Sequence, residues 1–549
     1  MALDDDLGEP PGPAAPVAAD DVIAPDDVIA QDDPIAADDP IAADNPVAGP
    51  APADAPGELT SDQPHWPPRR ADPVVWATAA AVFAAYTAIS VYKYLALQPA
   101  SWDLGIFTEA VKQYGHFQAP IVDLRAPGLN LLGDHFHPII ALLVPFFRLF
   151  PSPVTLLVAQ ALLAALSVIP VGRAAAELLG TGAGRAIAVA YGFSWGLQQL
   201  VSYDFHEVAF AVPLLAFSLS ALVTGRYRAA IWWAVPLVFV KEDQGFTVAA
   251  IGLLLAYAYR QRVAGLLLTG WGLAWSLLAI DVIIPHFNRQ HQYWYFTAAQ
   301  GQSGPLTPGH LLSQLLASPS AKLPTLALIG LVTMFAAVRS PVALVAVPGL
   351  LFRFVSPVPA TWGTAWHYNA TVMPIVFVAG IDALARMRAA DGAAQADHVS
   401  WIGRAARGAG VALGRHGPAM MLAVALALAF QFPLSNLWNP RTYAPSPQLA
   451  AARAGMALVS SGATVTTDLE LLAPLGARTD TFWIGNESKR PWLGVYPANP
   501  PTRYMVLDEF SLDWNGQPPS NFPAYVRSLE PRQGYRLIFS RDGIFVFRR

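Results

Sequence analysis

The stretch SWDLGIFTEAVKQYGHFQAPIVDLRAPGLNLLGDHFHP, residues 101–138, follows the first long apolar run of the chain. It holds a dense group of acidic and histidine side chains: Asp103, Glu109, His116, Asp123, Asp134, His135 and His137. Charged groups at a membrane boundary are costly to bury, so they usually mark a wet cavity or a functional site. We therefore interpret this stretch as an extramembrane loop that carries such a site.

The composition is that of a protein with many membrane spans. Of 549 residues, 54% are hydrophobic and only 13% are charged, whereas soluble domains carry about 25% charged residues. The 16 Trp residues suit the aromatic belts of membrane interfaces. The absence of Cys from the sequence excludes disulfides, thiolate metal sites and thiol catalysis.

Residues 1–70 are expected to be a disordered, acidic, cytoplasmic tail. The first 62 residues contain many Asp and no Lys or Arg. The formal net charge of the whole chain is −5, so the rest of the chain, without this acidic tail, carries a net positive charge. Within residues 20–45 the chain repeats DDVIAP, DDVIAQ and DDPIAA. Repeated Pro and like charges cannot build a packed core, which predicts disorder. The tail is interpreted as a solvated spacer, with a docking segment for a basic cytoplasmic partner as the alternative.

Residues 71–438 are expected to form a transmembrane domain of about eleven spans. Arg69 and Arg70 precede the first apolar run, and positive residues stay on the cytoplasmic side, so the N-terminus is expected inside. The apolar run 139–150 is short of the ~20 residues that a span needs. It is therefore interpreted as a re-entrant or surface helix within a first external loop, residues 99–153. The expected spans are 74–97, 154–171, 186–201, 208–223, 229–240, 244–259, 264–284, 323–338, 342–354, 367–384 and 418–432.

This threading places nearly all clustered Arg residues inside, as the positive-inside rule requires. It also places a set of polar residues at the external ends of spans: Asp103, Asp134, His135, His137, His206, Glu207, Lys241, Glu242, Asp243 and His367. A single polar cavity at the outer membrane boundary is the simplest interpretation of this set.

Residues 439–549 are expected to form a small extracytoplasmic α/β domain. Residues 447–461 have a helical composition, and the segments 463–467, 481–484, 504–507, 535–540 and 544–547 have strand composition. Asp542-Gly543 between the last two favours a hairpin turn. The segment contains no Gly-rich phosphate loop and no nucleophile elbow.

Five motifs resemble the bacterial membrane family known as domain of unknown function 2079. They are WDLGIF (102–107), GDHFHP (133–138), DFHEVAFAVPLL (204–215), KED (241–243) and HYNATVMP (367–374). That family is similar to the GT-C membrane glycosyltransferases. The resemblance implies a catalytic carboxylate in the first external loop and a sugar donor linked to polyprenyl phosphate.

Carried onto this chain, the resemblance implies that Asp103 is the catalytic base and that Glu207 is a second catalytic carboxylate, with Asp204 near it. Asp103 is also placed to cap the helix expected at residues 104–114, and both roles are compatible. Substrate and phosphate binding is expected of Lys241, His206, His367 and Glu242. For Lys241, a neutralising pair with Glu242 or Asp243 is the alternative.

Asp134, His135 and His137, together with Glu207 or His206, are the candidate ligands of a divalent metal, which is the one candidate cofactor. Solvated or hydrogen-bonded loop histidines are the alternative interpretation. His206-Glu207 stands where better-known branches have a plain acidic pair, which leaves metal use open.

The hypothesis is a membrane glycosyltransferase that moves a sugar from a polyprenyl-phosphate donor to an acceptor on the extracytoplasmic side. The expected location is a bacterial plasma membrane, crossed many times, with the C-terminal domain outside. The expected partners are the lipid-linked sugar and membrane lipid, and no nucleic acid. The alternatives are a transporter or flippase of a lipid-linked or polar substrate, and a non-catalytic scaffold.

Overall fold

The computed structural model describes residues 72–98, 101–293, 295, 307–356, 358–393, 401–444, 446–486, 496–511 and 522–549. All of them belong to one compact unit that begins at Pro68. The expected acidic tail, residues 1–70, lies outside the described residues.

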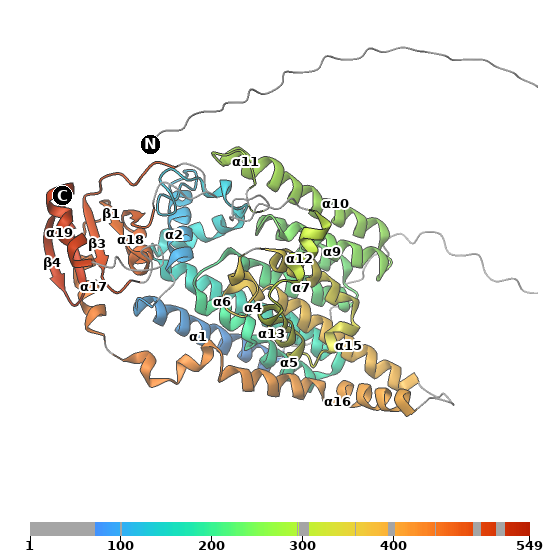
Figure 1. Cartoon of the computed structure of the whole chain (residues 1–549). Helices are drawn as coiled ribbons and strands as arrows, with labels where there is room; N and C mark the ends of the chain where they lie inside the picture. Colours follow the sequence, from blue (N-terminus) through green and yellow to red (C-terminus); the bar gives the residue numbers. More distant parts are fainter. Residues whose placement is uncertain are drawn as a thin grey trace, which may run out of the picture. The chain divides into compact units, whose positions relative to one another are not determined.

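Helices dominate the chain up to residue 444 (Figure 1). In order they are α1 (Pro73–Leu95), α2 (Trp102–Gly115), α3 (Val144–Leu149), α4 (Pro153–Leu179), α5 (Thr181–Gly192), α6 (Trp195–Tyr203), α7 (Ala211–Val223), α8 (Tyr227–Ala234), α9 (Gln244–Tyr257), α10 (Arg262–Leu278), α11 (Ile284–Phe287), α12 (Pro308–Leu316), α13 (Pro319–Leu331), α14 (Val347–Val355), α15 (Val372–Ala393) and α16 (Trp401–Ala429). Short turns of 3-10 helix precede or follow several of them, including η2 (Pro138–Leu143), η3 (Glu207–Phe210), η4 (Val235–Phe239), η9 (Pro341–Ala346) and η11 (His367–Asn369).

Five helical segments in the described part are long and apolar enough to cross a membrane. They are Pro73–Leu95, Pro153–Leu179, Arg262–Phe287, His367–Ala390 and Gly408–Ala429. Five further apolar helices are shorter: Pro138–Leu149, Glu207–Val223, Tyr227–Phe239, Gln244–Tyr257 and Pro341–Val355.

All eleven expected spans coincide with helical segments, but two of them are interrupted. The segment at 186–201 is broken between α5 and α6, and the one at 323–338 breaks after Leu331, where Met334 and Phe335 have positive φ. The mainly α-helical fold is therefore as expected, whereas the number of spans stays a prediction. Residues 139–150 form the short η2–α3 segment, which matches the short helix expected within the first loop.

Helix ends follow local sequence signals. The Asp72 carboxylate accepts from the backbone N–H of Val74 and Pro73 opens α1; Ser152 and Pro153 do the same for α4. A side-chain oxygen at the N-cap satisfies an otherwise unpaired N–H, and Pro at the first position loses no hydrogen bond. Gly180, with φ of 91°, ends α4 where a side chain would be strained.

Helices α9 and α10 approach each other through paired glycines. A Cβ added at Gly272 would lie 2.3 Å from the carbonyl oxygen of Gly245, and one at Gly265 would lie 2.5 Å from that of Gly252. Small residues allow this close backbone contact between membrane helices. The pair also fixes the loop before α9, because Ser276 Oγ of α10 donates to the carbonyl oxygen of Glu242 at 2.6 Å.

The C-terminal part contains a five-stranded sheet with strand order β2-β1-β3-β5-β4. The strands are β1 (Thr464–Thr467), β2 (Asp480–Trp483), β3 (Tyr504–Asp508), β4 (Arg536–Arg541) and β5 (Ile544–Arg548), with α17 (Pro447–Ala457), α18 (Leu472–Gly476) and α19 (Phe522–Gln533). Strand β1 is parallel to β2 and β3, and β5 is antiparallel to β3 and β4. The expected strands and the Asp542-Gly543 hairpin turn, where both residues have positive φ, are present.

The sheet domain is attached to the start of α2 (Figure 1). Ser101 Oγ accepts from the backbone N–H of Ala473 at 2.9 Å, and the rings of Trp102 and Trp483 lie 4.9 Å apart. These contacts flank Asp103, so the C-terminal domain helps to place the helix that carries it.

The paired glycines generate a stability test. Gly272→Ala should lower the free energy of unfolding by roughly 1–3 kcal/mol, because an inserted methyl must push α9 and α10 apart. Gly270→Ala, on the same helix with open space around the new Cβ, should be neutral or stabilising, since Ala favours a helix over Gly by about 1 kcal/mol. Thermal unfolding of both variants in detergent measures the difference. Equal effects of the two substitutions would contradict the close-packing argument.

Candidate functional site

A cavity of about 360 Å³ lies among helix ends and loops that are far apart in the sequence. Its polar lining includes most of the expected site residues: Asp103, Asp134, His135, His137, His206, Glu207, Lys241, Asp243 and His367. Its apolar lining comes mainly from η9, α14 and α15. The structure thus brings together the side chains that the sequence distributed over four separate segments.

Asp103 is the second residue of α2 and lines the cavity. The alternative in which Asp103 caps this helix is wrong: the N-cap is Ser101, and the N–H of Leu104 donates to Asp204 Oδ2 at 2.9 Å. Because Asp204 satisfies this N–H from another segment, the Asp103 carboxylate is not needed by the helix end. Asp103 is half-buried, and the Tyr203 hydroxyl is its neighbour.

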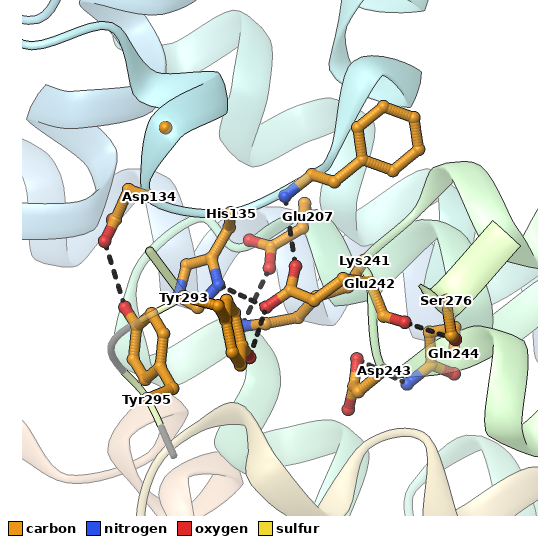
Figure 2. A network of polar contacts seen from close by, with 12 residues as sticks. Asp134, His135, Glu207, Lys241, Glu242, Asp243, Gln244, Ser276, Tyr293 and Tyr295 are labelled. Carbon is orange, nitrogen blue, oxygen red and sulfur yellow. Dashed lines mark hydrogen bonds and ion pairs between the residues drawn. The ribbon is translucent and has the colours of Figure 1, made fainter. Parts of the chain in front are cut away.

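Glu207 and Lys241 form a buried ion pair, with 3.2 Å between Glu207 Oε1 and Lys241 Nζ (Figure 2). His206 Nδ1 lies 2.7 Å from the other Glu207 oxygen. The expected alternative, in which Glu242 or Asp243 neutralises Lys241, is therefore replaced by a pair with Glu207. Burial alone would lower the pKa of Lys241, but Glu207, Glu242 and Asp243 outweigh burial and raise the pKa, so Lys241 carries its charge.

Glu242 is the centre of a second network, seen beside the first in Figure 2. Its Oε1 lies 2.7 Å from His135 Nδ1 and accepts from Tyr293 Oη at 3.1 Å, while its Oε2 accepts from the N–H of Phe136 at 3.0 Å. Burial would raise the pKa of Glu242, but His135 and Lys241 outweigh burial and hold the pKa at about 2. Glu242 is not among the residues that line the cavity. Its observed contacts tie the DHFH segment to the start of α9.

The three candidate metal ligands point to different partners. Asp134 pairs with Arg125 at 3.0 Å and accepts from Tyr295 Oη at 3.1 Å, and His135 faces Glu242. His137 is buried, and its ring packs edge-on to Phe107. Burial lowers the pKa of His137 to about 4, so its ring is neutral at physiological pH.

A different group could hold a divalent ion. Asp103, His206 and His367 each offer one ligand atom, and these atoms lie within 4.8 Å of one another. From the sequence, Asp103 is expected to be the base, His367 to bind substrate, and His206 to bind substrate or complete the DHFH metal site. Their grouping was not visible in the sequence because they come from three segments separated by more than a hundred residues.

Arg353 provides a further cation in the cavity wall. It is buried, donates to the carbonyl oxygens of Thr361 and Tyr368, and also donates to Asn369 Oδ1 at 3.0 Å. No carboxylate lies within ion-pair range of Arg353 among the described residues. In the sequence, this residue is a lone Arg near the end of an apolar run. A charge in such a position is costly to bury and usually marks a functional site.

Glu109, in the opening stretch, is a residue of α2 that does not line the cavity. It is buried, and its Oε2 accepts from the N–H of Leu124 at 3.2 Å. Burial raises the pKa of Glu109 to about 8, although Lys112 opposes this shift. Glu109 is therefore largely protonated at neutral pH and holds the following loop against α2.

The fold belongs to the GT-C class of membrane proteins. It is similar to the crystal structure of ArnT from Cupriavidus metallidurans bound to undecaprenyl phosphate, with a TM-score of 0.50 and 13% sequence identity. That similarity covers 86% of this chain and 97% of the other. The apo crystal structure of the same ArnT gives a TM-score of 0.46 at 13% identity, covering 85% and 98% of the two chains.

Residues 93–544 match the family described as predicted membrane protein (DUF2079), and the chain belongs to this family. The match includes all five motifs and strands β1 to β4 of the C-terminal sheet, ends at the start of β5, and leaves out the acidic tail. No curated protein matches the sequence. The chain is thus a membrane protein of this family with a GT-C fold.

The buried Glu109 carboxyl generates a pH-dependent prediction. Because its folded pKa of about 8 lies above the ordinary 4.5, Glu109 opposes folding increasingly as pH rises from 4.5 to 8. Glu109→Gln keeps an acceptor for Leu124 and should stabilise the protein by up to about 3 kcal/mol at pH 7. Thermal unfolding should show this gain at pH 7–8 and little gain at pH 4.5.

The control is Glu177→Gln, because Glu177 is an exposed residue that pairs with Arg226 at the surface. It should show no comparable rise in stability with pH. A gain from Glu109→Gln that is the same at every pH would contradict the assignment of a raised pKa.

Proposed function

We propose that this protein is a glycosyltransferase that moves a sugar from a polyprenyl-phosphate donor to an acceptor at the extracytoplasmic face of the membrane. The observation that carries the proposal is the composition of the cavity. Its lining includes the Asp103 carboxylate, the cationic side chains of Lys241 and Arg353, and apolar side chains of η9, α14 and α15. A lipid-linked sugar phosphate has the same division into a reacting polar head and a long hydrocarbon tail.

Asp103 is the proposed general base. The acceptor hydroxyl would attack the anomeric carbon of the donor sugar while its proton passes to Asp103. The bond between that carbon and the phosphate oxygen would break, and the electron pair would leave with the polyprenyl phosphate. A base within hydrogen-bonding reach typically contributes about 10²–10⁴-fold in rate. Asp103 suits this role because its carboxylate lines the cavity and has no capping duty.

The departing phosphate needs positive charge near it. Lys241 lines the cavity but already pairs with Glu207. Arg353 is held rigidly by carbonyl oxygens, which position the guanidinium without neutralising it. We assign Arg353 as the principal phosphate-binding cation and Lys241 as a second one, with Glu207 and His206 keeping Lys241 in place. In this assignment Glu207 orients other groups and does not itself take the proton.

The lipid chain is assigned to the apolar wall formed by η9 and α14. Val345, Ala346, Gly349 and Phe352 line the cavity on this side. Leu344 and Leu351 of the same elements are exposed, as is expected of residues that face lipid. A chain could therefore pass from the membrane along α14 to the phosphate beside Arg353. A divalent cation belongs to the proposal as the cofactor of this site.

Asp103→Asn tests the base. The amide matches the carboxylate in size but cannot take a proton, so transfer should fall by at least about 10²-fold. The measurement is transfer of radiolabelled sugar from membrane extracts or purified polyprenyl-phosphate sugars, with folding checked by thermal unfolding. The control is Asp123→Asn in the same loop, since Asp123 does not line the cavity. Full transfer by a folded Asp103→Asn protein would refute the proposed function.

Gly349→Phe tests the lipid wall. A Cβ added at Gly349 meets open space, so the ring should enter the cavity without disturbing α14. We expect the KM for a polyprenyl-phosphate donor to rise at least tenfold, because the ring occupies the space assigned to the lipid. Leu351→Phe, on the exposed face of α14, is the matched control and should leave the KM unchanged. An unchanged KM in the Gly349→Phe protein would place the lipid elsewhere.

A further inference from the structure

We propose that Asp103, His206 and His367 bind one divalent transition-metal ion at the polar end of the cavity. The ligand atoms of the three residues lie within 4.8 Å of one another. Two imidazole nitrogens and one carboxylate oxygen form a ligand set that is common in metal sites with an open coordination position. The cavity borders all three residues, so that position would face the substrate.

The two histidines show the features of ligands. His367 is buried, and its Nδ1 has no hydrogen-bond partner in the described part of the chain. An unpaired buried polar atom is costly, and a bound ion would satisfy it. The rings of His206 and His367 stack face to face with centroids 3.5 Å apart, so the two imidazoles are in contact although they come from different segments, and a ring rotation would direct a nitrogen of each at one ion.

Glu207 supplies an orienting contact for one of these ligands. Its Oε2 lies 2.7 Å from His206 Nδ1. A histidine that ligates a metal usually donates its other N–H to a carboxylate, which fixes the tautomer and the ring orientation. Nε2 of His206 is then the nitrogen left for the ion. Glu207 would therefore act as a positioning residue behind the metal, with Lys241 balancing its charge at 3.2 Å.

The three ligand atoms would need to move only slightly closer together to bind one ion. Zinc ligands lie about 2.0–2.2 Å from the ion, so neighbouring ligand atoms in a tetrahedral site are about 3.4 Å apart. Side-chain rotations that move the ligand atoms by about an ångström would bring them from a separation of up to 4.8 Å to this geometry. Two nitrogen ligands favour Zn²⁺ or another transition metal over Mg²⁺ or Ca²⁺, which prefer oxygen.

This set differs from the one expected from the DHFH motif. Asp134 and His135 are engaged with Arg125 and Glu242. Of the three residues in this motif, His137 alone has an Nδ1 without a hydrogen-bond partner in the described part of the chain. The metal is thus assigned to the junction of α2, η3 and η11. The inference deepens the proposed function, because a cation there would supply positive charge to a phosphate in the same cavity, but metal binding does not depend on sugar transfer.

The test uses purified full-length protein with a cleaved, non-histidine tag, stripped with a chelator and titrated with Zn²⁺ against a chromophoric competitor. We expect about one tightly bound zinc per chain and no comparable binding of Mg²⁺. His206→Ala and His367→Ala should each weaken zinc binding more than 100-fold. Glu207→Gln should weaken it about 10- to 100-fold, as removal of an orienting carboxylate does. His116→Ala, at an exposed position, should have no effect.

A measurement on the unsubstituted protein guards against variants that fail to fold. Pulsed EPR of the Cu²⁺-loaded protein should detect two coordinated imidazoles. His137→Ala should keep both the zinc and this spectrum. Absence of stoichiometric zinc binding, a spectrum with no coordinated imidazole, or loss of zinc in His137→Ala but not in His206→Ala and His367→Ala would overturn the assignment. Zinc binding without sugar transfer would refute only the proposed function, and transfer by protein that binds no zinc would refute only the metal site.

Discussion

The buried ion pair between Glu207 and Lys241 is the constraint on which the cavity depends. Two charges taken out of water are tolerated only if they meet at close range and find further polar partners. Here the pair joins the first residue of η3 to Lys241 in the loop between η4 and α9, and His206 and Glu242 lie next to it. Removing either partner would leave an uncompensated buried charge, so the two segments must stay together.

Asp103 owes its position to contacts made by its neighbours. Asp204 caps the helix end in its place, the Ser101 hydroxyl binds the sheet domain through Ala473, and Trp102 packs on Trp483. These contacts satisfy the backbone N–H of Leu104 and anchor the two residues before Asp103. The Asp103 carboxylate is consequently left to face the cavity. The C-terminal domain therefore contributes to the site without lining it.

The cavity combines two environments that are usually separate. Its polar side is built from loops and helix ends, where backbone groups and side chains can satisfy buried charges. Its apolar side is built from η9 and α14, whose outer residues are exposed. Arg353 lines the cavity, and its guanidinium donates hydrogen bonds to carbonyl oxygens of the segment after α14, which fixes this segment against the helix. This arrangement explains why a guanidinium is found near the end of an apolar helix.

The sequence by itself determined the class of the protein, its helical segments, the strands of the C-terminal sheet and the list of chemically capable residues. Those features depend on local composition and periodicity, which act within a few residues. The tertiary structure decided which of these residues meet. In the folded chain Lys241 pairs with Glu207 and not with its chain neighbours Glu242 and Asp243. Asp204 accepts the hydrogen bond from the N–H of Leu104 at the start of α2. His367 lies close to Asp103 and His206. Such pairings depend on the packing of segments that lie from 34 to more than 200 residues apart in the chain. Burial makes each of them selective, because a charge or imidazole removed from water must find its partner in the space around it.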